Sequence, residues 1–269
     1  MEVFIFCTLL FSVFFLFEVL FPYFDRFMIY RKRKEFIQHE PYYRDLVFRN
    51  IRFFHWLDIE QQEKFLFRTY LFQRSRKFHY VGVEASPEMP VLISAVAAQL
   101  TLGLDKFTLN YFRDIYVLEH DYHYGFYSLP FMGHVDSSGI YLSWDNFLHG
   151  LGNTRDSSNV GLHEMAHALA YVNFVTKTEE DKHFIKEFKN FSKIARPIFQ
   201  EMQRGRKNLL GDYAATNYHE FWAISVEMFF ENPLRFKHEL PDLYLAMSKV
   251  LKQDPIEQIK YKRSIIYRK

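Results

Sequence analysis

The stretch that decides how this chain folds is NVGLHEMAHAL, residues 159–169. Its apolar residues recur with helical spacing from about residue 157 to residue 172, which predicts a helix there. His163 and His167 stand four positions apart in this helix, and Glu164 directly follows the first histidine. Residues four apart in a helix are separated by about 6 Å along its axis and project from nearly the same side, so both imidazoles can reach one metal ion.

The HExxH spacing of these residues is typical of a catalytic zinc site. Glu164 lies on the adjoining face of the helix, where its carboxylate can take a proton from the attacking water and pass it to a leaving amine. The alternative is a helix that carries two histidines by chance. A histidine pair in an otherwise apolar helix needs polar partners, and a metal ion is one. We therefore expect His163 and His167 to bind zinc and Glu164 to act as the general base of a peptidase.

A catalytic zinc site needs a third protein ligand. The pattern HExxHxxGxxH is excluded, because Ala170 and Asn173 occupy the positions of its glycine and its third histidine. The third ligand must therefore come from further along the chain. The candidates are Glu179, Glu180, His183, His219, Glu220 and Glu227.

Two of these glutamates lie in NYHEFWAISVEMFFE, residues 217–231, an apolar stretch that predicts a buried helix. Glu220 is on its first turn, and Glu227 is two turns later on nearly the same face. This placement suggests Glu220 as the zinc ligand and Glu227 as a group that orients an imidazole. Alternatively, Glu220 follows Asn217 by three positions, as in a capping arrangement at a helix start. The spacing leaves both roles of Glu220 open.

The rest of the chain predicts an α+β fold that is predominantly helical. Helical spacing marks residues 42–57, 60–72 and 91–102. Short stretches rich in β-branched and aromatic residues predict strands of a small sheet at residues 77–85, 114–118 and 139–144. No linker rich in Gly, Pro or Ser divides the chain after residue 40, so we expect one domain at residues 41–269.

The first 24 residues predict a transmembrane helix. Residues 3–24 are almost wholly apolar, interrupted only by Glu18, and match the ~20 residues that cross a bilayer. A basic cluster follows in the connector at residues 25–40, so the positive-inside rule places the domain in the cytoplasm, tied to the inner membrane. The alternative is an aromatic-rich core helix, because Glu18 is costly in lipid.

Composition limits the partners of this chain. The net charge is +2 and the basic residues are scattered, which argues against nucleic acid as a partner. The single cysteine, Cys7, excludes an intramolecular disulfide and a cysteine-based metal site. Aromatic residues make up 19% of the chain, and we expect most of them in the core.

Longer stretches around HExxH resemble the Mlc titration factor A (MtfA) family of zinc-dependent peptidases. The resemblance covers roughly residues 40–255. Besides the 159–169 stretch, the segments that fall in family order are SGIYLSW at 138–144, DYAATN at 212–217, EFWA at 220–223, EMFFENP at 227–233 and DP at 254–255.

The resemblance implies a zincin-like (gluzincin) fold similar to the catalytic domain of anthrax lethal factor. It implies one zinc ion held by the two histidines and by a glutamate from a later helix, which by motif position is Glu220. It also implies that Tyr213 stabilises the oxyanion of the tetrahedral intermediate. The residues alone would make Tyr213 a core or turn aromatic.

This chain departs from the family pattern at two places. Ala168-Leu169-Ala170 stands where many members carry Lys-Leu-Asp, and Asn217-Tyr218 replaces the usual Asn-Pro. Neither change removes a proposed ligand. They limit how far the substrate preference of the family carries over to this chain.

We expect a membrane-tethered zinc peptidase that hydrolyses a peptide or protein substrate, with the strand at 139–144 holding the peptide by backbone pairing. The rival is a membrane-anchored regulatory protein with a structural or vestigial zinc site, because the family takes its name from a member that sequesters a transcriptional repressor. Such a protein could have a regulatory protein partner. Glu164 favours the enzyme, since an inert scaffold has no need of it between the two ligands.

Overall fold

The computed structural model describes residues 27–266, apart from positions 124, 126–129, 153–157 and 179. The chain divides into two compact units, one ending at Tyr42 and one beginning at Tyr43. In the first unit, residues 27–42 are helical. The transmembrane helix predicted at residues 1–24 lies outside the described residues. Among the helices that are described, none combines the length and the apolar character needed to cross a bilayer.

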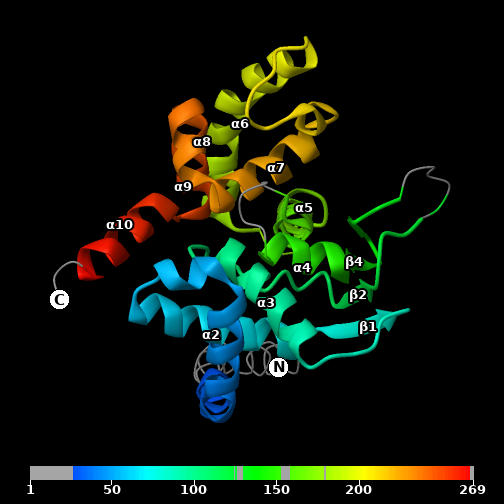
Figure 1. Ribbon diagram of the computed structural model, residues 1–269, viewed down its shortest axis with the longest axis vertical. Helices are drawn as coiled ribbons and strands as arrows, with labels where there is room; N and C mark the ends of the chain where they lie inside the picture. Colours follow the sequence, from blue (N-terminus) through cyan, green and yellow to red (C-terminus); the bar gives the residue numbers. More distant parts are fainter. Residues whose placement is uncertain (1–26, 124, 126–129, 153–157, 179, 267–269) are drawn as a thin grey trace, which may run out of the picture. The chain divides into compact units, whose positions relative to one another are not determined.

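The second unit is predominantly helical with one small sheet, which confirms the predicted α+β class. It begins with helical residues 43–50. The elements that follow are η1 (Arg52–Trp56), α2 (Ile59–Arg74), β1 (Lys77–Val81), α3 (Glu88–Thr101), β2 (Asp114–Leu118), β3 (Gly133–Asp136), β4 (Gly139–Ser143), α4 (Trp144–Gly152), α5 (Val160–Phe174), α6 (Lys182–Gln203), η2 (Asp212–Ala215), α7 (Tyr218–Glu231), α8 (Pro233–Glu239), α9 (Pro241–Leu251) and α10 (Pro255–Ile266) (Figure 1).

The sheet has the strand order β1-β2-β4-β3. β1, β2 and β4 run parallel, and helix α3 makes the crossover from β1 to β2 that parallel strands require. β3 pairs antiparallel with β4 and lies at one edge of the sheet. Ile115, Val117, Ile140 and Leu142 project from β2 and β4 into the core, where each is fully buried.

The sheet differs from the prediction in three respects. β3 was not anticipated, because Gly-His-Val-Asp has no alternation of apolar residues. β1 ends at Val81 because Gly82 adopts a φ of +71°, which ends the strand before residue 85. β4 ends at Ser143, and it cannot hold a peptide along its length, because β2 and β3 already pair with its two sides. The expectation that residues 139–144 bind substrate is therefore wrong.

Helix α5, which carries HExxH, lies at the centre of the unit. It packs against β3, β4, α3 and α4, and against α7. α3 is buried from Met89 to Thr101, so the apolar run predicted at 91–102 is a core helix. The helix predicted at 42–57 is interrupted at Ile51, whose backbone is extended (φ −108°, ψ 97°). The central position of α5 explains why its flanking residues are apolar all round.

The face of the sheet opposite the core carries a row of stacked rings. His79, Tyr116, Tyr141 and His134 lie opposite one another, one on each strand. Their neighbouring ring centroids are 4.7, 4.4 and 4.2 Å apart. Cross-strand ring pairs of this kind stabilise a sheet. Part of the aromatic content of the chain therefore lies half-buried on this face and outside the core.

Candidate metal centre and active site

Helix α5 begins at a cap that is tied to α7. Asn159 accepts a hydrogen bond from the Leu162 N–H at 3.0 Å through its side-chain oxygen, which is the usual N-cap contact. Its backbone N–H donates to Glu227 Oε2 at 2.5 Å, and its side-chain amide donates to Glu231 Oε1 at 3.0 Å. The N-cap role of Asn159 was not predicted, although an asparagine just before an apolar helical run is a standard N-cap signal.

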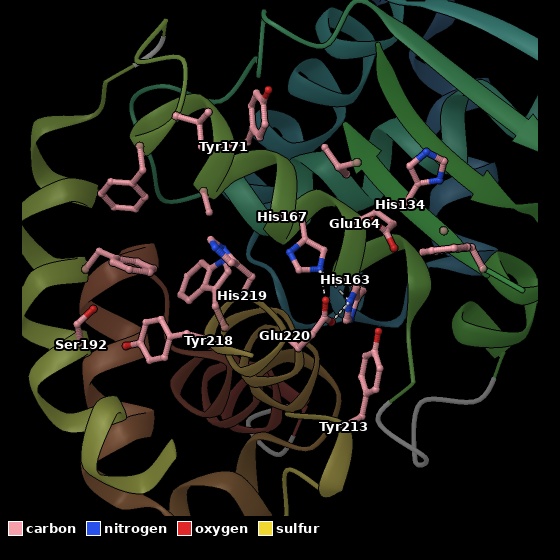
Figure 2. Close-up of a pocket in the computed structure, with 18 of the residues that line it drawn as sticks. His134, His163, Glu164, His167, Tyr171, Ser192, Tyr213, Tyr218, His219 and Glu220 are labelled. Atoms are coloured by element: carbon pink, nitrogen blue, oxygen red, sulfur yellow. Dashed lines mark hydrogen bonds and ion pairs between the residues drawn. The ribbon is translucent and has the colours of Figure 1, made fainter. Parts of the chain in front are cut away.

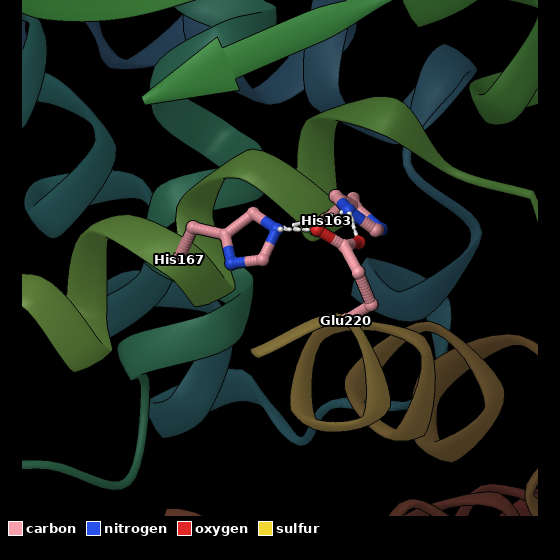
Figure 3. A group of neighbouring side chains, drawn as sticks. All are labelled: His163, His167 and Glu220. Carbon is pink, nitrogen blue, oxygen red and sulfur yellow. Dashed lines mark hydrogen bonds and ion pairs between the residues drawn. The ribbon is translucent and has the colours of Figure 1, made fainter. Parts of the chain in front are cut away.

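His163, His167 and Glu220 meet in one cluster. The two Nε2 atoms are 3.0 Å apart, and the Glu220 carboxylate lies 2.9 Å from His163 Nε2 and 3.5 Å from His167 Nε2. Figure 3 shows both imidazoles, from α5, turned toward the carboxylate from α7. One ligand atom from each residue lies within 4.8 Å of the others, and all three residues are half-buried. Two imidazole nitrogens and a carboxylate oxygen in this arrangement fit a metal ion.

The role of Glu220 as a helix cap is not observed. Asn217 caps α7 with its own side-chain oxygen, which accepts from the N–H groups of His219 and Glu220 at 2.9 and 3.0 Å. The carboxylate of Glu220 is directed to the two histidines. Of the two roles that the sequence left open, the structure therefore places the side chain of Glu220 at the histidine pair.

Glu227 holds the first histidine in place. It is 5% exposed, and its Oε1 lies 2.7 Å from His163 Nδ1. Because a carboxylate only accepts hydrogen bonds, Nδ1 carries a proton in this contact, and Nε2 is the ring nitrogen that faces the cluster and could bind a metal ion. Burial alone would lower the pKa of His163, but its contacts with Glu220 and Glu227 raise that pKa well above the usual value.

Glu164 lies beside this cluster under the edge strand. It is 3% exposed, and burial raises the pKa of its carboxyl to about 8, with His163 opposing the shift and Glu220 and Glu227 adding to it. Gly133 of β3 passes directly over it. A Cβ atom at Gly133 would lie 2.7 Å from Glu164 Cγ and Oε1, so any larger residue there would force the Glu164 side chain to shift. No pattern in the sequence indicates this contact.

Tyr213 reaches the site from η2. It lines a cavity that is also lined by His163, Glu164, His167 and Glu220. The centroid of its ring is 6.4 Å from that of His163. Figure 2 shows its hydroxyl group pointing toward His163 and Glu220. Partial burial is the main cause that raises the pKa of Tyr213 to about 12, and the negative charges of Glu220 and Glu164 add to this shift. The phenol is therefore protonated near neutral pH and available as a hydrogen-bond donor.

The cavity that contains these groups has a volume of about 500 Å³. Among the described residues, the other ligand candidates do not join the cluster. His183 binds the carbonyl of Lys249 at 2.7 Å, Glu180 is exposed, and Glu179 lies outside the described residues. His219 lines the cavity, but no group of metal-binding side chains includes it among the described residues.

Glu164 makes the stability of the metal-free protein depend on pH. Its pKa is about 8 in the folded chain against an ordinary value of 4.5, so between these pH values the folded state holds more protons than the unfolded state. The free energy of unfolding then falls as pH rises. Glu164→Gln removes this titration, so the variant should gain stability over the wild type as pH increases from about 5 to about 8.

Urea unfolding in the presence of a chelator measures this difference. Glu84→Gln, at an exposed position in the loop after β1, is the matched control and should differ from the wild type by the same small amount at both pH values. A stability difference for Glu164→Gln that does not change between the two pH values would contradict the prediction.

Comparison with known proteins agrees with this site. The sequence matches the family described as glucose-regulated metallo-peptidase M90 over residues 28–252, a range that includes His163, Glu164, His167, Tyr213 and Glu220. A curated relative, an uncharacterized protein of Synechocystis sp., is 26% identical over 121 residues. The matched part is 44% of this chain and 44% of that relative, so the chain spans less than half of its length. By the match over residues 28–252, this chain belongs to the M90 family of glucose-regulated metallopeptidases, the MtfA-like family that its motifs resemble.

Proposed function

We propose that this chain is a zinc-dependent peptidase in which His163, His167 and Glu220 hold the ion and Glu164 is the general base. The observation that carries the proposal is the meeting of this three-residue cluster with a buried carboxylate in one cavity. Two histidines and one glutamate are a known ligand set of catalytic zinc, which leaves one coordination position for water or substrate. The 3.0 Å between the two Nε2 atoms is close to the ~3.3 Å expected for nitrogens ~2.0–2.1 Å from one tetrahedral zinc ion.

Zinc, when bound, supplies a Lewis acid that polarises the scissile carbonyl and makes a neighbouring water more acidic. Glu164 then moves the proton. Its carboxylate takes a proton from the attacking water and returns it to the nitrogen of the leaving amine. Burial raises the pKa of Glu164 toward the range in which a carboxyl group can do both near neutral pH.

Tyr213 is proposed to support the charge that develops on the scissile carbonyl oxygen. Its raised pKa keeps the hydroxyl protonated, so the phenol can donate a hydrogen bond to the oxyanion. Its ring is 60% exposed, which leaves it free to adjust to a bound peptide. Its position on the short η2 segment, one residue after Asp212, puts it among the residues that line the cavity.

β3 is the strand that we propose for peptide binding, in place of β4. β3 is the last strand in the order of the four-stranded sheet, and Gly133, His134 and Val135 line the cavity. An extended peptide can add to such an edge by main-chain hydrogen bonds. It would then pass over Glu164, because Gly133 lies against this residue.

Glu164→Gln should keep bound zinc and lose peptide hydrolysis, with kcat/KM lowered by about 10²–10⁴-fold, because the ligands are intact and the base is absent. Tyr213→Phe should lower kcat by about 10²-fold with KM nearly unchanged. Metal analysis and a broad peptide panel measure both effects, with Glu84→Gln and Tyr261→Phe as exposed controls. A wild type that binds no zinc or cleaves no peptide would sink the proposal and favour a regulatory binding protein.

Glu227→Gln should lower zinc affinity by about 10–100-fold while the chain stays folded, because the amide no longer fixes the His163 ring as a carboxylate does. Competition with a chromogenic chelator measures the affinity. Glu239→Gln, on the surface of α8, is the control and should bind zinc like the wild type. An unchanged affinity in Glu227→Gln would show that the contact with His163 has no part in metal binding.

We also propose that the enzyme is tethered to the inner membrane by residues 1–24, with the catalytic unit in the cytoplasm. The support is the apolar stretch and the basic cluster that follows it. The protein should pellet with membranes and be released by detergent but not by high salt. A reporter fused after Lys269 should give a cytoplasmic signal, and a periplasmic signal would contradict the proposed orientation.

A further inference from the structure

The cavity extends beyond the cluster of His163, His167 and Glu220, on the side of His167 that faces away from Glu164 (Figure 2). Its volume of about 500 Å³ lies in the range typical of ligand sites, ~300–1,000 Å³, and exceeds what an ion and a water require. Tyr171, Ser192 and Tyr218 lie on this side in Figure 2. We use the name apolar lobe for the part of this cavity that is lined by Ala170, Tyr171, Phe174, Val175, Phe188 and Trp222.

The inner wall of the apolar lobe is a set of interlocked rings. The ring of Phe188 lies 4.8 Å from that of Phe174 and 5.0 Å from that of Trp222. Trp222 is 1% exposed, and its indole N–H donates to the carbonyl of Ala166 at 3.0 Å. Because these rings are held by one another and by α5, the lobe is formed before any ligand arrives.

The rim of the apolar lobe leaves apolar surface open to solvent. Phe174 is 37% exposed and Val175 is 61% exposed. Ala170 lies one turn after His167 on α5, so the lobe begins directly beside this histidine. Exposed apolar surface that adjoins a candidate active site gains free energy when a ligand covers it.

None of the six lobe residues carries a charge. The same cavity is also lined by the polar residues Ser192, Arg196, Tyr218 and His219, and the guanidinium of Arg196 lies over the ring of Tyr218, 5.4 Å from the centroid. A charged side chain of a substrate that packs against the six lobe residues would lose hydration without meeting an opposite charge on any of them. A large apolar side chain would lose only its unfavourable contact with water. The lobe therefore discriminates by polarity and by size.

We infer that the apolar lobe binds the side chain of a large apolar residue, aromatic or leucine, next to the scissile bond of the substrate. The inference rests on the proposed peptidase function, which puts the scissile bond at the cluster of His163, His167 and Glu220. A lobe that adjoins this cluster receives a side chain flanking that bond. The substrate class is thus peptides with a bulky apolar residue at the cleavage site.

A series of internally quenched peptides tests this with the full-length, zinc-loaded protein. The peptides share one sequence of small residues and differ at one position, which carries Phe, Leu, Ala or Glu. Mass spectrometry identifies the cleaved bond. We expect cleavage next to Phe or Leu, with kcat/KM about 10–100-fold above that of the Ala peptide and further above that of the Glu peptide. Equal kcat/KM values would overturn the inference and leave the peptidase function standing.

Substitution of Ala170 tests the lobe directly. Ala170→Phe fills it, so the ratio of kcat/KM for the Phe peptide over the Ala peptide should fall about tenfold or more. Ala85→Phe, in the exposed loop after β1, is the matched control and should keep the wild-type ratio. Ala170→Asp adds a charge with little bulk and should lower the same ratio, which keeps the test valid if Ala170→Phe does not fold. An unchanged ratio in folded Ala170 variants would overturn the inference.

Binding to Glu164→Gln separates the lobe from catalysis. By calorimetry, the Phe peptide should bind this variant about tenfold more tightly than the Ala peptide, and adding Ala170→Asp should remove the difference. If the wild type cleaves no peptide but this binding pattern holds, the peptidase function fails and the lobe stands as a binding site for bulky apolar side chains. Equal Kd values for the two peptides would overturn the lobe.

Discussion

Both carboxylate oxygens of the buried Glu227 are used by the first turn of α5, and the geometry of the site depends on these two contacts. One oxygen lies 2.7 Å from His163 Nδ1, and the other accepts from the backbone N–H of Asn159 at 2.5 Å. A buried carboxylate without partners is costly, so α7 can pack on α5 only in a register that satisfies Glu227. That register sets Glu220, two turns earlier on the same face of α7, against His163 and His167. One pair of contacts thus orients an imidazole and delivers the third member of the cluster.

The same packing brings three carboxylates, Glu164, Glu220 and Glu227, into one poorly hydrated place, where a cation is electrostatically favoured. The pKa values of Glu164 and Glu220 are shifted in opposite directions. Burial raises the pKa of Glu164 to about 8, whereas contacts with His163 and His167 outweigh burial and hold the pKa of Glu220 well below its usual value. Neighbouring carboxyls whose pKa values are pushed apart suit a site in which one group moves a proton and another stays ionised as a ligand.

Aromatic residues serve this protein in two places that composition does not distinguish. On the outer face of the sheet, a row of four stacked rings crosses all four strands in register. Behind the cavity, Phe188 and Trp222 form a wall together with Phe174 and Phe191. The first set stabilises the strand order that puts β3 at the edge, beside Glu164. The second shapes the apolar part of the cavity. An aromatic content of 19% therefore indicates large buried areas. Only the fold shows which aromatic residues lie on the sheet and which lie behind the cavity.

By itself, the sequence determined the features that depend on neighbours along the chain. Helical periodicity places His163, Glu164 and His167 on one helix, and the second apolar run places Glu220 and Glu227 on another. Tertiary structure alone places the carboxylate of Glu220 at the two histidines, because it reaches them only when α7 packs on α5. It also revealed β3 and the close approach of Gly133 to Glu164, since the strand GHVD has no periodic signal and this contact joins distant parts of the chain. Local propensity acts over a few residues, whereas a buried polar group finds its partners across the whole packed unit.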